Sequence, residues 1–204
     1  MDPRAHWDGI YQSRSVGELS WFQPEARRSL ELITRFAPDR SAPIIDVGGG
    51  ASVLVDDLLD AGYTDLTVLD ISAAALATVK ERLGAMAPRV RWLEGDILSA
   101  PLDEAGYAFW HDRAVFHFLT RAKDRKAYVD RVRQSVRRGG HVLVATFGSD
   151  GPTKCSGLPV VRYSVDSLQS EFGPGFHMLA SEHEDHRTPD GRSQSFLYCL
   201  CRRE

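Results

Sequence analysis

The sequence contains few cysteines and no long run of apolar residues. Its three cysteines among 204 residues are an odd number, which argues against the disulfide framework of a secreted domain. No apolar run reaches the length needed to cross a bilayer, and the N-terminus does not resemble a secretion signal. We therefore expect a cytoplasmic protein that does not associate with membranes.

Basic stretches and clusters of metal ligands are also missing. The formal net charge is −3, and no dense stripe of lysine and arginine is interleaved with aromatic residues, so we expect no nucleic-acid partner. Histidines, cysteines and carboxylates do not gather at the close spacing that a metal site needs, so we expect no metal. The length of 204 residues predicts a single domain over 1–204, and we expect a monomer or a weak dimer.

The sequence does contain a glycine turn between a strand pattern and a helix pattern. The apolar run Ile44–Val47 is typical of a buried strand, and helical spacing begins at Val53. Between them stand three consecutive glycines, Gly48, Gly49 and Gly50. Glycine adopts backbone angles that other residues avoid, and its missing Cβ lets a ligand lie directly on the backbone. The turn therefore predicts a ligand site.

Two acidic residues indicate which ligand this turn binds. The turn lacks the Lys-Ser/Thr ending of a P-loop and the G-x-G-x-x-G spacing of dinucleotide folds. Asp46 precedes the glycines, where a carboxylate would repel a pyrophosphate but suits a positively charged amino group. Asp70 ends the next apolar run, about 20 residues past the glycines, where such folds place the carboxylate that binds ribose hydroxyls. The pattern favours a nucleoside that carries an amino acid.

The stretch Ile45–Gly50 resembles the first motif of the class I S-adenosylmethionine-dependent methyltransferases, hydrophobic-Asp-x-Gly-x-Gly. Ser52 stands where many members of that family carry a third glycine. The resemblance implies an enzyme that uses S-adenosylmethionine and releases S-adenosylhomocysteine. The cofactor-binding residues that we predict from the pattern and the resemblance are Trp7, Tyr11, Trp21, Phe22, Asp46, Gly48, Gly49, Gly50, Asp70, Ile71, Asp96, Ile97 and His111.

The order of strand and helix patterns predicts an α/β fold. Strand and helix alternate three times before residue 100, which calls for a parallel sheet with crossover helices. A helix over 124–138 then leads into a strand over 141–147, and strand patterns over 176–186 and 193–201 flank Asp190-Gly191, a strong hairpin signal. With the strand number usual in this family, we predict a three-layer, doubly wound and mostly parallel seven-stranded sheet with a C-terminal antiparallel hairpin.

Aromatic residues gather in an N-terminal arm, residues 1–23. Trp7 and Tyr11 are four residues apart, so a short helix places them on one face. The arm is either a staple that packs on the domain or a lid whose rings cover the sulfonium end of the cofactor. Small bacterial methyltransferases often begin with a similar His-Trp-Asp-x-x-Tyr segment and a later Ser-Trp-Phe, here His6–Tyr11 and Ser20–Phe22. The resemblance favours the lid.

Asp96 follows the third strand pattern and has two interpretations. It is either a turn former that caps the next segment or, as the resemblance implies, the acceptor for the adenine amino group. In the second case the apolar neighbour Ile97 packs on the adenine ring. The resemblance favours the adenine role.

The end of the fourth strand, predicted over 106–110, carries the candidate catalytic residues. Ligands of open α/β sheets bind outside the carboxyl ends of strands, so His111, Asp112 and Arg113 face the expected reaction site. His117 follows Arg113 by one helical turn and could share its face. If the acceptor needs a general base, His111 or His117 could serve, with Asp112 orienting it. Alternatively, Asp112 only caps the helix that begins at Arg113, and His117 is half-exposed.

Residues 148–163 form the longest stretch without a periodic pattern, which predicts a functional or mobile loop on the substrate side. Cys155 lies beside Lys154 in this polar loop, a setting that could lower the pKa of a thiol. Methyl transfer from a sulfonium needs no covalent nucleophile on the enzyme. We therefore expect Cys155 and Tyr163 to contact substrate.

The acceptor of the methyl group is less defined than the cofactor. The segment 110–113 lacks the Asn/Asp-Pro-Pro-Tyr/Phe motif of family members that methylate nucleobase or amide nitrogen. The short chain without an added substrate domain favours a small molecule with a thiol, sulfide, metalloid or hydroxyl acceptor. One alternative is a protein lysine methyltransferase, which should offer an acidic groove. Another is a regulatory protein that binds S-adenosylmethionine without catalysis.

Overall fold

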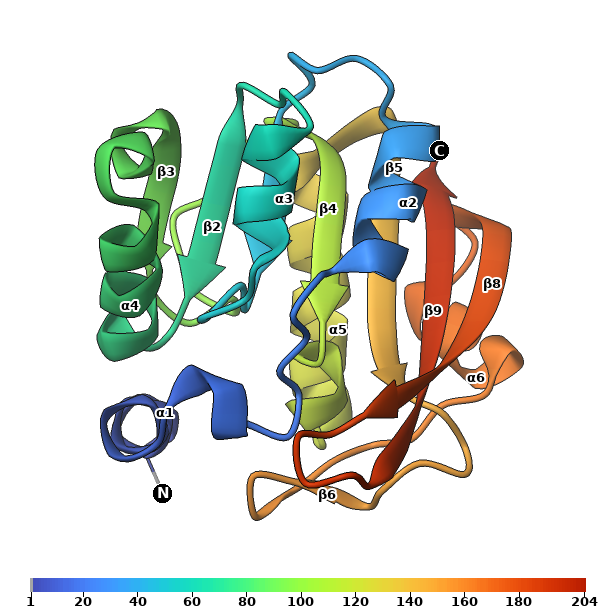
Figure 1. Ribbon diagram of the computed structural model, residues 1–204. Coiled ribbons are helices and arrows are strands. Elements are labelled where there is room, and N and C mark those ends of the chain that lie inside the picture. The colour runs from blue at the N-terminus through green and yellow to red at the C-terminus, as the bar shows by residue number, and fades with distance from the viewer. Residues whose placement is uncertain (1) are drawn as a thin grey trace.

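The computed structural model describes residues 2–204, and a seven-stranded sheet forms its centre (Figure 1). The strand order is β3-β2-β1-β4-β5-β9-β8. β9 runs opposite to the other six strands and is therefore antiparallel to β5 and β8, while all other neighbouring pairs are parallel. The chain winds outward from β1 in one direction and from β4 in the other, so a crevice for ligands opens at their carboxyl ends. The strands are β1 (Ile44–Val47), β2 (Leu66–Asp70), β3 (Val90–Glu94), β4 (Tyr107–Arg113), β5 (Val136–Phe147), β8 (Phe176–Arg187) and β9 (Ser193–Arg203).

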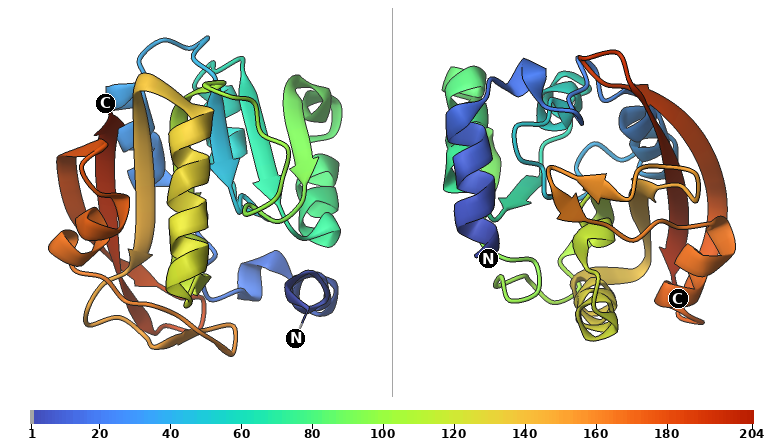
Figure 2. Two further views of the ribbon diagram at one scale, coloured as in Figure 1. Left: turned by 180° about the vertical axis from the view of Figure 1, so that it is seen from behind. Right: turned by 90° about the horizontal axis from the view of Figure 1, so that it is seen from below.

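Helices cover both faces of the sheet, which gives the predicted three layers (Figures 1 and 2). One face packs against α2 (Arg27–Phe36), α3 (Leu54–Asp60) and α4 (Ala73–Leu83), and the other against α5 (Ala122–Ser135) and α6 (Val165–Phe172). Side chains of β1 alternate between the two cores, as a strand buried on both faces requires. The predicted α/β fold with a C-terminal antiparallel hairpin is confirmed.

The boundaries of the elements around β4 and β5 differ from the sequence prediction. The helix expected to end at residue 138 ends at Ser135, and β5 begins at Val136 instead of His141 because Val136 already pairs with Tyr107 of β4. The fourth strand continues to Arg113 because it stays paired with β5 to that point. Hydrogen-bonded pairing with a neighbouring strand outweighed the local helix propensity. A local sequence pattern does not reveal such pairing.

The N-terminal arm forms a helix, α1 (Pro3–Ser13), and a short 3₁₀ turn, η1 (Val16–Glu18). Asp8 fastens α1 to the first turn of α4, because its carboxylate accepts from the Ser72 hydroxyl at 2.6 Å and from the Ala74 N–H at 3.2 Å. The Ser72 hydrogen bond lowers the pKa of Asp8. The arm therefore lies across the carboxyl-terminal edge of the sheet, as the view from below shows (Figure 2).

The loop after β5 contains a small hairpin of two short strands, β6 (Lys154–Cys155) and β7 (Leu158–Pro159). It lies at the same end of the molecule as α1 and the β8–β9 turn (Figures 1 and 2). Across residues 2–204, no helix is long and apolar enough to cross a membrane.

Candidate functional site

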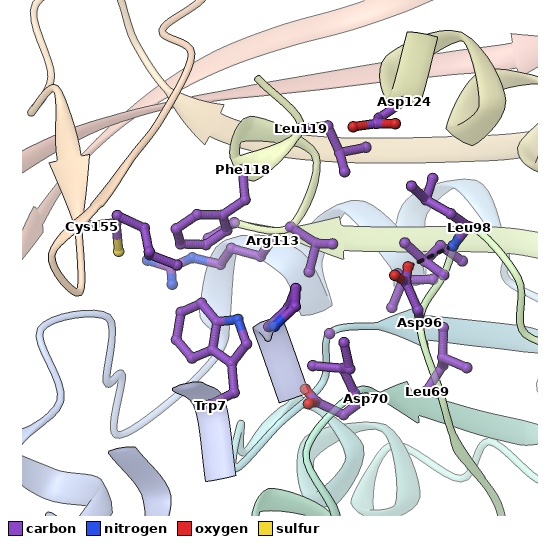
Figure 3. Close-up of a pocket in the computed structure, with 18 of the residues that line it drawn as sticks. Trp7, Leu69, Asp70, Asp96, Leu98, Arg113, Phe118, Leu119, Asp124 and Cys155 are labelled. Atoms are coloured by element: carbon purple, nitrogen blue, oxygen red, sulfur yellow. Dashed lines mark hydrogen bonds between the residues drawn. The ribbon is translucent and has the colours of Figure 1, made fainter. Parts of the chain in front are cut away.

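A cavity of about 420 Å³ opens at the carboxyl ends of β1, β2 and β4 (Figure 3). Gly48 follows β1, while Asp70 and Arg113 end β2 and β4. Trp7 of the arm and Cys155 of β6 close the cavity from outside the sheet. Its volume lies in the range of sites that enclose a small organic ligand.

The glycine turn has no room for side chains at two positions. Gly48 has a φ of +66°, and a Cβ there would lie 2.0 Å from Val115 Cγ2. Gly50 has a φ of +49°, and its Cβ would lie 2.6 Å from the Tyr11 hydroxyl oxygen. The Gly48 N–H donates to the Leu69 carbonyl at 2.7 Å, which fixes the turn against β2. Sterics and backbone conformation thus both require glycine here.

Asp70 presents a carboxylate to the cavity from the end of β2. Its Oδ1 accepts from the Ser72 N–H at 2.8 Å, and the residue is only 8% exposed. Burial raises the pKa of Asp70 to about 7. Hydrogen bonds from the N–H groups of Ser72 and Gly50 lower this pKa but have the smaller effect. Because this pKa exceeds the unfolded value of 3.8, the favourable contribution of Asp70 to stability is complete below that value and is lost as the pH rises through about 7. Ionised Asp70 therefore opposes folding.

Asp96 and Ile97 line the cavity beside Asp70 (Figure 3). Asp96 Oδ1 accepts from the Leu98 N–H at 2.9 Å, which is the turn-forming role. The same carboxylate also reaches the cavity, so its two interpretations are compatible. Whether it binds adenine stays a prediction.

A smaller cavity of about 50 Å³ lies behind the glycine turn and is lined in part by Phe22, Asp46, Gly49 and His111. Trp21 belongs to the walls of both this cavity and the main one. The two cavities together therefore contact every predicted cofactor residue except Gly50, whose backbone lies under Tyr11.

His111 is held by two neighbours and does not reach the main cavity. β1 and β4 pair with Asp46 opposite His111, and Asp46 Oδ1 lies 2.7 Å from His111 Nδ1. The other ring nitrogen lies 2.8 Å from the Ser29 hydroxyl. Both nitrogens are therefore occupied, and the interpretation of His111 as a general base facing substrate is wrong. Its place beside the cofactor stays a prediction.

Asp112 and His117 are also buried away from the cavity, which corrects their interpretation as groups that face substrate. Asp112 accepts from the Val115 and Phe116 N–H groups at 2.9 and 3.1 Å and from the Tyr128 hydroxyl at 2.5 Å. These contacts hold the turn after β4. The helix that the sequence predicted from Arg113, with Asp112 as its cap, does not form because β4 continues to Arg113, and His117 is buried instead of half-exposed. Burial raises the pKa of Asp112 to about 6. Burial lowers the pKa of His117 to about 3, so its ring is neutral and packs on Phe147.

The substrate-side loop needs two corrections. Tyr163 is buried against Phe116 and does not line the cavity, because β-bridge pairing with Gly148 turns it inward. Cys155 does line the cavity but is only 5% exposed, and burial raises the pKa of its thiol to about 11. The lowered thiol pKa expected from Lys154 is therefore wrong.

Aromatic rings and one cation form the side of the cavity nearest the arm (Figure 3). Trp7 makes edge contacts with Trp21 and Phe118 at centroid distances of 5.7 and 5.2 Å, and Tyr11 contacts Trp21 at 6.3 Å. Trp7 and Tyr11 share the inner face of α1, so the predicted arrangement of the arm over the site is present. Such faces suit a sulfonium cation.

Arg113 is the cation of this wall. Its Nε donates to the Tyr198 hydroxyl at 2.9 Å, its Nη1 donates to the Trp21 carbonyl at 3.2 Å, and it stacks over Phe196 at 4.1 Å. Its buried Nη2 has no hydrogen-bond partner within residues 2–204, and the nearest carboxylate oxygen, on Glu184, is 3.9 Å away. This N–H group therefore lacks a hydrogen-bond acceptor, while Glu184 partly compensates the charge of the guanidinium.

Several site residues escaped the sequence reasoning. Phe118 and Asp124 line the cavity from the turn after β4 and from α5, and no spacing rule relates them to the glycine motif. Asp8 was visible within the His6–Tyr11 segment, but its docking onto α4 is a tertiary contact. Within residues 2–204, no group of three or more histidines, cysteines and carboxylates is placed to hold a metal ion.

The residues of both cavities fit the parts of S-adenosylmethionine. Asp70 offers a carboxylate to hydroxyl groups. Asp96 offers a hydrogen-bond acceptor, and Ile97 offers an apolar surface. The turn at Gly48 has no side chain, which leaves room for a ligand against the backbone. When bound, the cofactor supplies an electrophilic methyl group on a sulfonium. The chain's own residues bind it, orient it and exclude water.

The fold and these cavities resemble those of the class I S-adenosylmethionine-dependent methyltransferases. Residues 44–140, slightly less than half of the chain, match the family described as a methyltransferase domain. This match and the methyltransferases among the similar proteins agree with the predicted enzyme and its cofactor, S-adenosylmethionine.

Known proteins of several substrate types are similar to the chain. Human EEF1A lysine methyltransferase 2 is 23% identical over 196 residues, which cover 88% of this chain and 76% of that protein. A structure from work on the conversion of a disulfide bond into a thioacetal group in echinomycin biosynthesis has a TM-score of 0.77 at 17% identity, over 98% of this chain and 93% of that one. Burkholderia thailandensis 1,6-didemethyltoxoflavin-N1-methyltransferase, solved with S-adenosylhomocysteine, has a TM-score of 0.71 at 19% identity, over 88% and 79%.

Proposed function

We propose that this methyltransferase transfers the methyl group to a small molecule whose acceptor is a soft, easily deprotonated atom, a thiol or sulfide in the first instance. The observation that carries the proposal is the chemistry of the cavity wall around Arg113. This wall joins aromatic faces, the Cys155 side chain and a guanidinium with an unpartnered N–H group.

The wall contains no group that would serve as a general base. The carboxylates that line the cavity within residues 2–204 are Asp70, Asp96 and Asp124, and none comes from the arm or from the β6–β7 hairpin. His111 and His117 are turned away, and burial raises the pKa of the Cys155 thiol to about 11. A hydroxyl acceptor would need a base, whereas a thiol with an ordinary pKa near 8.5 supplies thiolate itself.

Arg113 would stabilise such a thiolate at the position of attack. Its guanidinium is held by Tyr198, Trp21 and Phe196, so the free Nη2 has a defined direction. A fixed cation lowers the pKa of a neighbouring thiol, which raises the thiolate fraction at neutral pH. The similarity to a structure from work on disulfide-to-thioacetal conversion agrees with sulfur as acceptor.

A lysine acceptor is suggested by the similarity to human EEF1A lysine methyltransferase 2. A lysine enzyme must receive a cationic side chain and release its proton. The cation of Arg113 beside the methyl position opposes both requirements, and the acidic groove expected for such an enzyme has no counterpart in the arm-side wall. We therefore favour the small-molecule acceptor. The match to a methyltransferase domain favours an enzyme over a purely regulatory protein.

Arg113→Met should lower kcat/KM for a thiol acceptor about tenfold at pH 7 and move the alkaline rise of its pH profile upward, because thiolate stabilisation is lost. Arg113→Lys keeps a charge and should retain more of the activity. Release of S-adenosylhomocysteine, measured from pH 6 to 9, gives both values. Identical pH profiles for the wild type and both variants would contradict the role of Arg113, and thermal melts of each variant control for folding.

A further inference from the structure

A second cavity, of about 510 Å³, lies outside the aromatic wall and is lined by residues from three distant parts of the chain. α1 contributes His6, Arg14 follows directly after α1, the β6–β7 hairpin contributes Lys154, and the β8–β9 turn contributes Arg192. Figure 2 shows these three segments gathered at one end of the molecule. We name this space the outer cavity.

The outer cavity is positively charged in a protein whose net charge is −3. No aspartate or glutamate lines it in the part of the chain that the structure describes. Arg192 pairs with Asp190 at 2.7 Å, so its charge is partly compensated. Neither Arg14 nor Lys154 forms an ion pair within residues 2–204, and both are exposed. A concave surface with two free cations raises the local concentration of anions.

Two buried polar atoms of residues that line the outer cavity lack hydrogen-bond partners among residues 2–204. Gln194 is 7% exposed and lines the outer cavity, and its side-chain oxygen has no hydrogen-bond partner among residues 2–204. The Nε2 atom of His6, from the opposite wall, is also buried without a partner. Unsatisfied buried polar groups are costly unless a ligand or water completes them. Of these two atoms, only the imidazole nitrogen of His6 can donate to an anion, because an amide oxygen accepts.

The outer cavity lies directly against the reaction site. Trp21 and Cys155 line both the outer cavity and the main cavity, so only side chains separate the two. Arg113 lies on the inner side of this boundary and Lys154 on the outer side. The two cavities therefore share a wall that Trp21 and Cys155 form.

We propose that the outer cavity binds the anionic end, a carboxylate or a phosphate, of the small acceptor whose nucleophilic atom is methylated beside Arg113. This inference rests on the proposed function and assigns the substrate class: a small acidic molecule that carries a soft nucleophile. Arg14 and Lys154 supply the charge, and His6 supplies a hydrogen bond. The same charges repel a lysine side chain.

The test uses two probes that differ in one charge, 4-mercaptobenzoate and its methyl ester. Calorimetry on the full chain saturated with S-adenosylhomocysteine should give at least fivefold tighter binding of the acid, and the preference should shrink as salt is added. Arg14→Glu combined with Lys154→Glu should abolish this preference while it leaves binding of the ester within twofold. Arg137→Glu combined with Arg138→Glu is the matched control, because it makes the same change of charge at the amino end of β5 and should keep the preference.

Equal affinity of the wild type for acid and ester would overturn the assignment of the outer cavity, whatever the turnover of either probe. Equal loss of the preference in both double variants would also overturn it, since the effect would then come from net charge. Failure to methylate either thiol, with the acid preference intact, would refute the thiol acceptor and leave the anion site standing. Carboxylate and phosphate are distinguished by repeating the titration with a phosphorylated thiol.

Discussion

We expect Asp70→Ala to weaken binding of S-adenosylhomocysteine about 5- to 150-fold, which corresponds to about 1–3 kcal/mol for the loss of a buried hydrogen-bonding partner. The carboxylate stands at the end of β2, faces the main cavity and is fixed by the Ser72 N–H at 2.8 Å. No other acidic side chain lies close enough in sequence to take its place on β2. Isothermal titration at pH 7.5 measures the change.

Replacement of the Asp70 carboxylate should stabilise the empty protein, although it weakens cofactor binding. Burial raises the pKa of Asp70 to about 7, so ionisation of this carboxyl above that pH opposes folding of the empty protein. Asp70→Asn should therefore be more stable than the wild type at pH 7.5 and lose this advantage as the pH falls toward 4. Urea unfolding at several pH values tests the sign. Unchanged affinity in Asp70→Ala would contradict the ribose-binding assignment, and a pH-independent stability difference in Asp70→Asn would contradict the raised pKa of Asp70.

Asp112→Ala should lower the free energy of unfolding by about 2–4 kcal/mol, because three buried donors lose their acceptor. These donors are the Val115 and Phe116 N–H groups and the Tyr128 hydroxyl. They hold the turn after β4, in which Ala114 has a φ of 72°, a strained angle for a residue other than glycine. Thermal unfolding should show a decrease of about 5–15 °C.

Asp112→Asn is the control, because its amide oxygen still accepts from part of this network. It should lose much less stability than the alanine variant. Since Val115 and Phe118 of this turn line the main cavity, the alanine variant should also bind S-adenosylhomocysteine less tightly. A melting temperature within 2 °C of the wild type for Asp112→Ala would show that the network contributes little.

The cofactor half of the site was predictable because it depends on local sequence. Gly48 and Gly50 are needed for positive φ angles and for close approach of Val115 and Tyr11. Asp70 is fixed by its place at the end of a strand, and parallel strands bring their carboxyl ends to one edge. The alternation of strands and helices followed from the same kind of local pattern. Local rules were sufficient wherever one element alone positions the residue.

The reacting half was not predictable because it depends on which way side chains turn at the end of β4. Three consecutive residues there have different surroundings: His111 faces Asp46, Asp112 faces Tyr128, and Arg113 faces Tyr198. No periodicity distinguishes these directions, since they are set by the neighbouring strands and by α5. The sequence assigned catalysis to His111, Asp112, Arg113 and His117, and the core encloses all of these except Arg113.

The arm shows how one short motif serves several purposes. Trp7 and Tyr11 line the main cavity, Asp8 docks α1 onto α4, and His6 reaches the outer cavity. The helical spacing predicted the shared face of Trp7 and Tyr11. The other two roles arise from contacts with residues that are distant in the sequence, so only the folded chain displays them.

Competition between acceptors tests the central claim most directly. The enzyme would be given S-adenosylmethionine with a deuterated methyl group and equal amounts of 4-mercaptobenzoate, 4-hydroxybenzoate and a lysine peptide, and products would be identified by mass spectrometry. We predict that the label appears in the thioether at pH 7 and neither on the phenol oxygen nor on lysine. Label found only on the peptide or on the hydroxyl acceptor would contradict the proposed function.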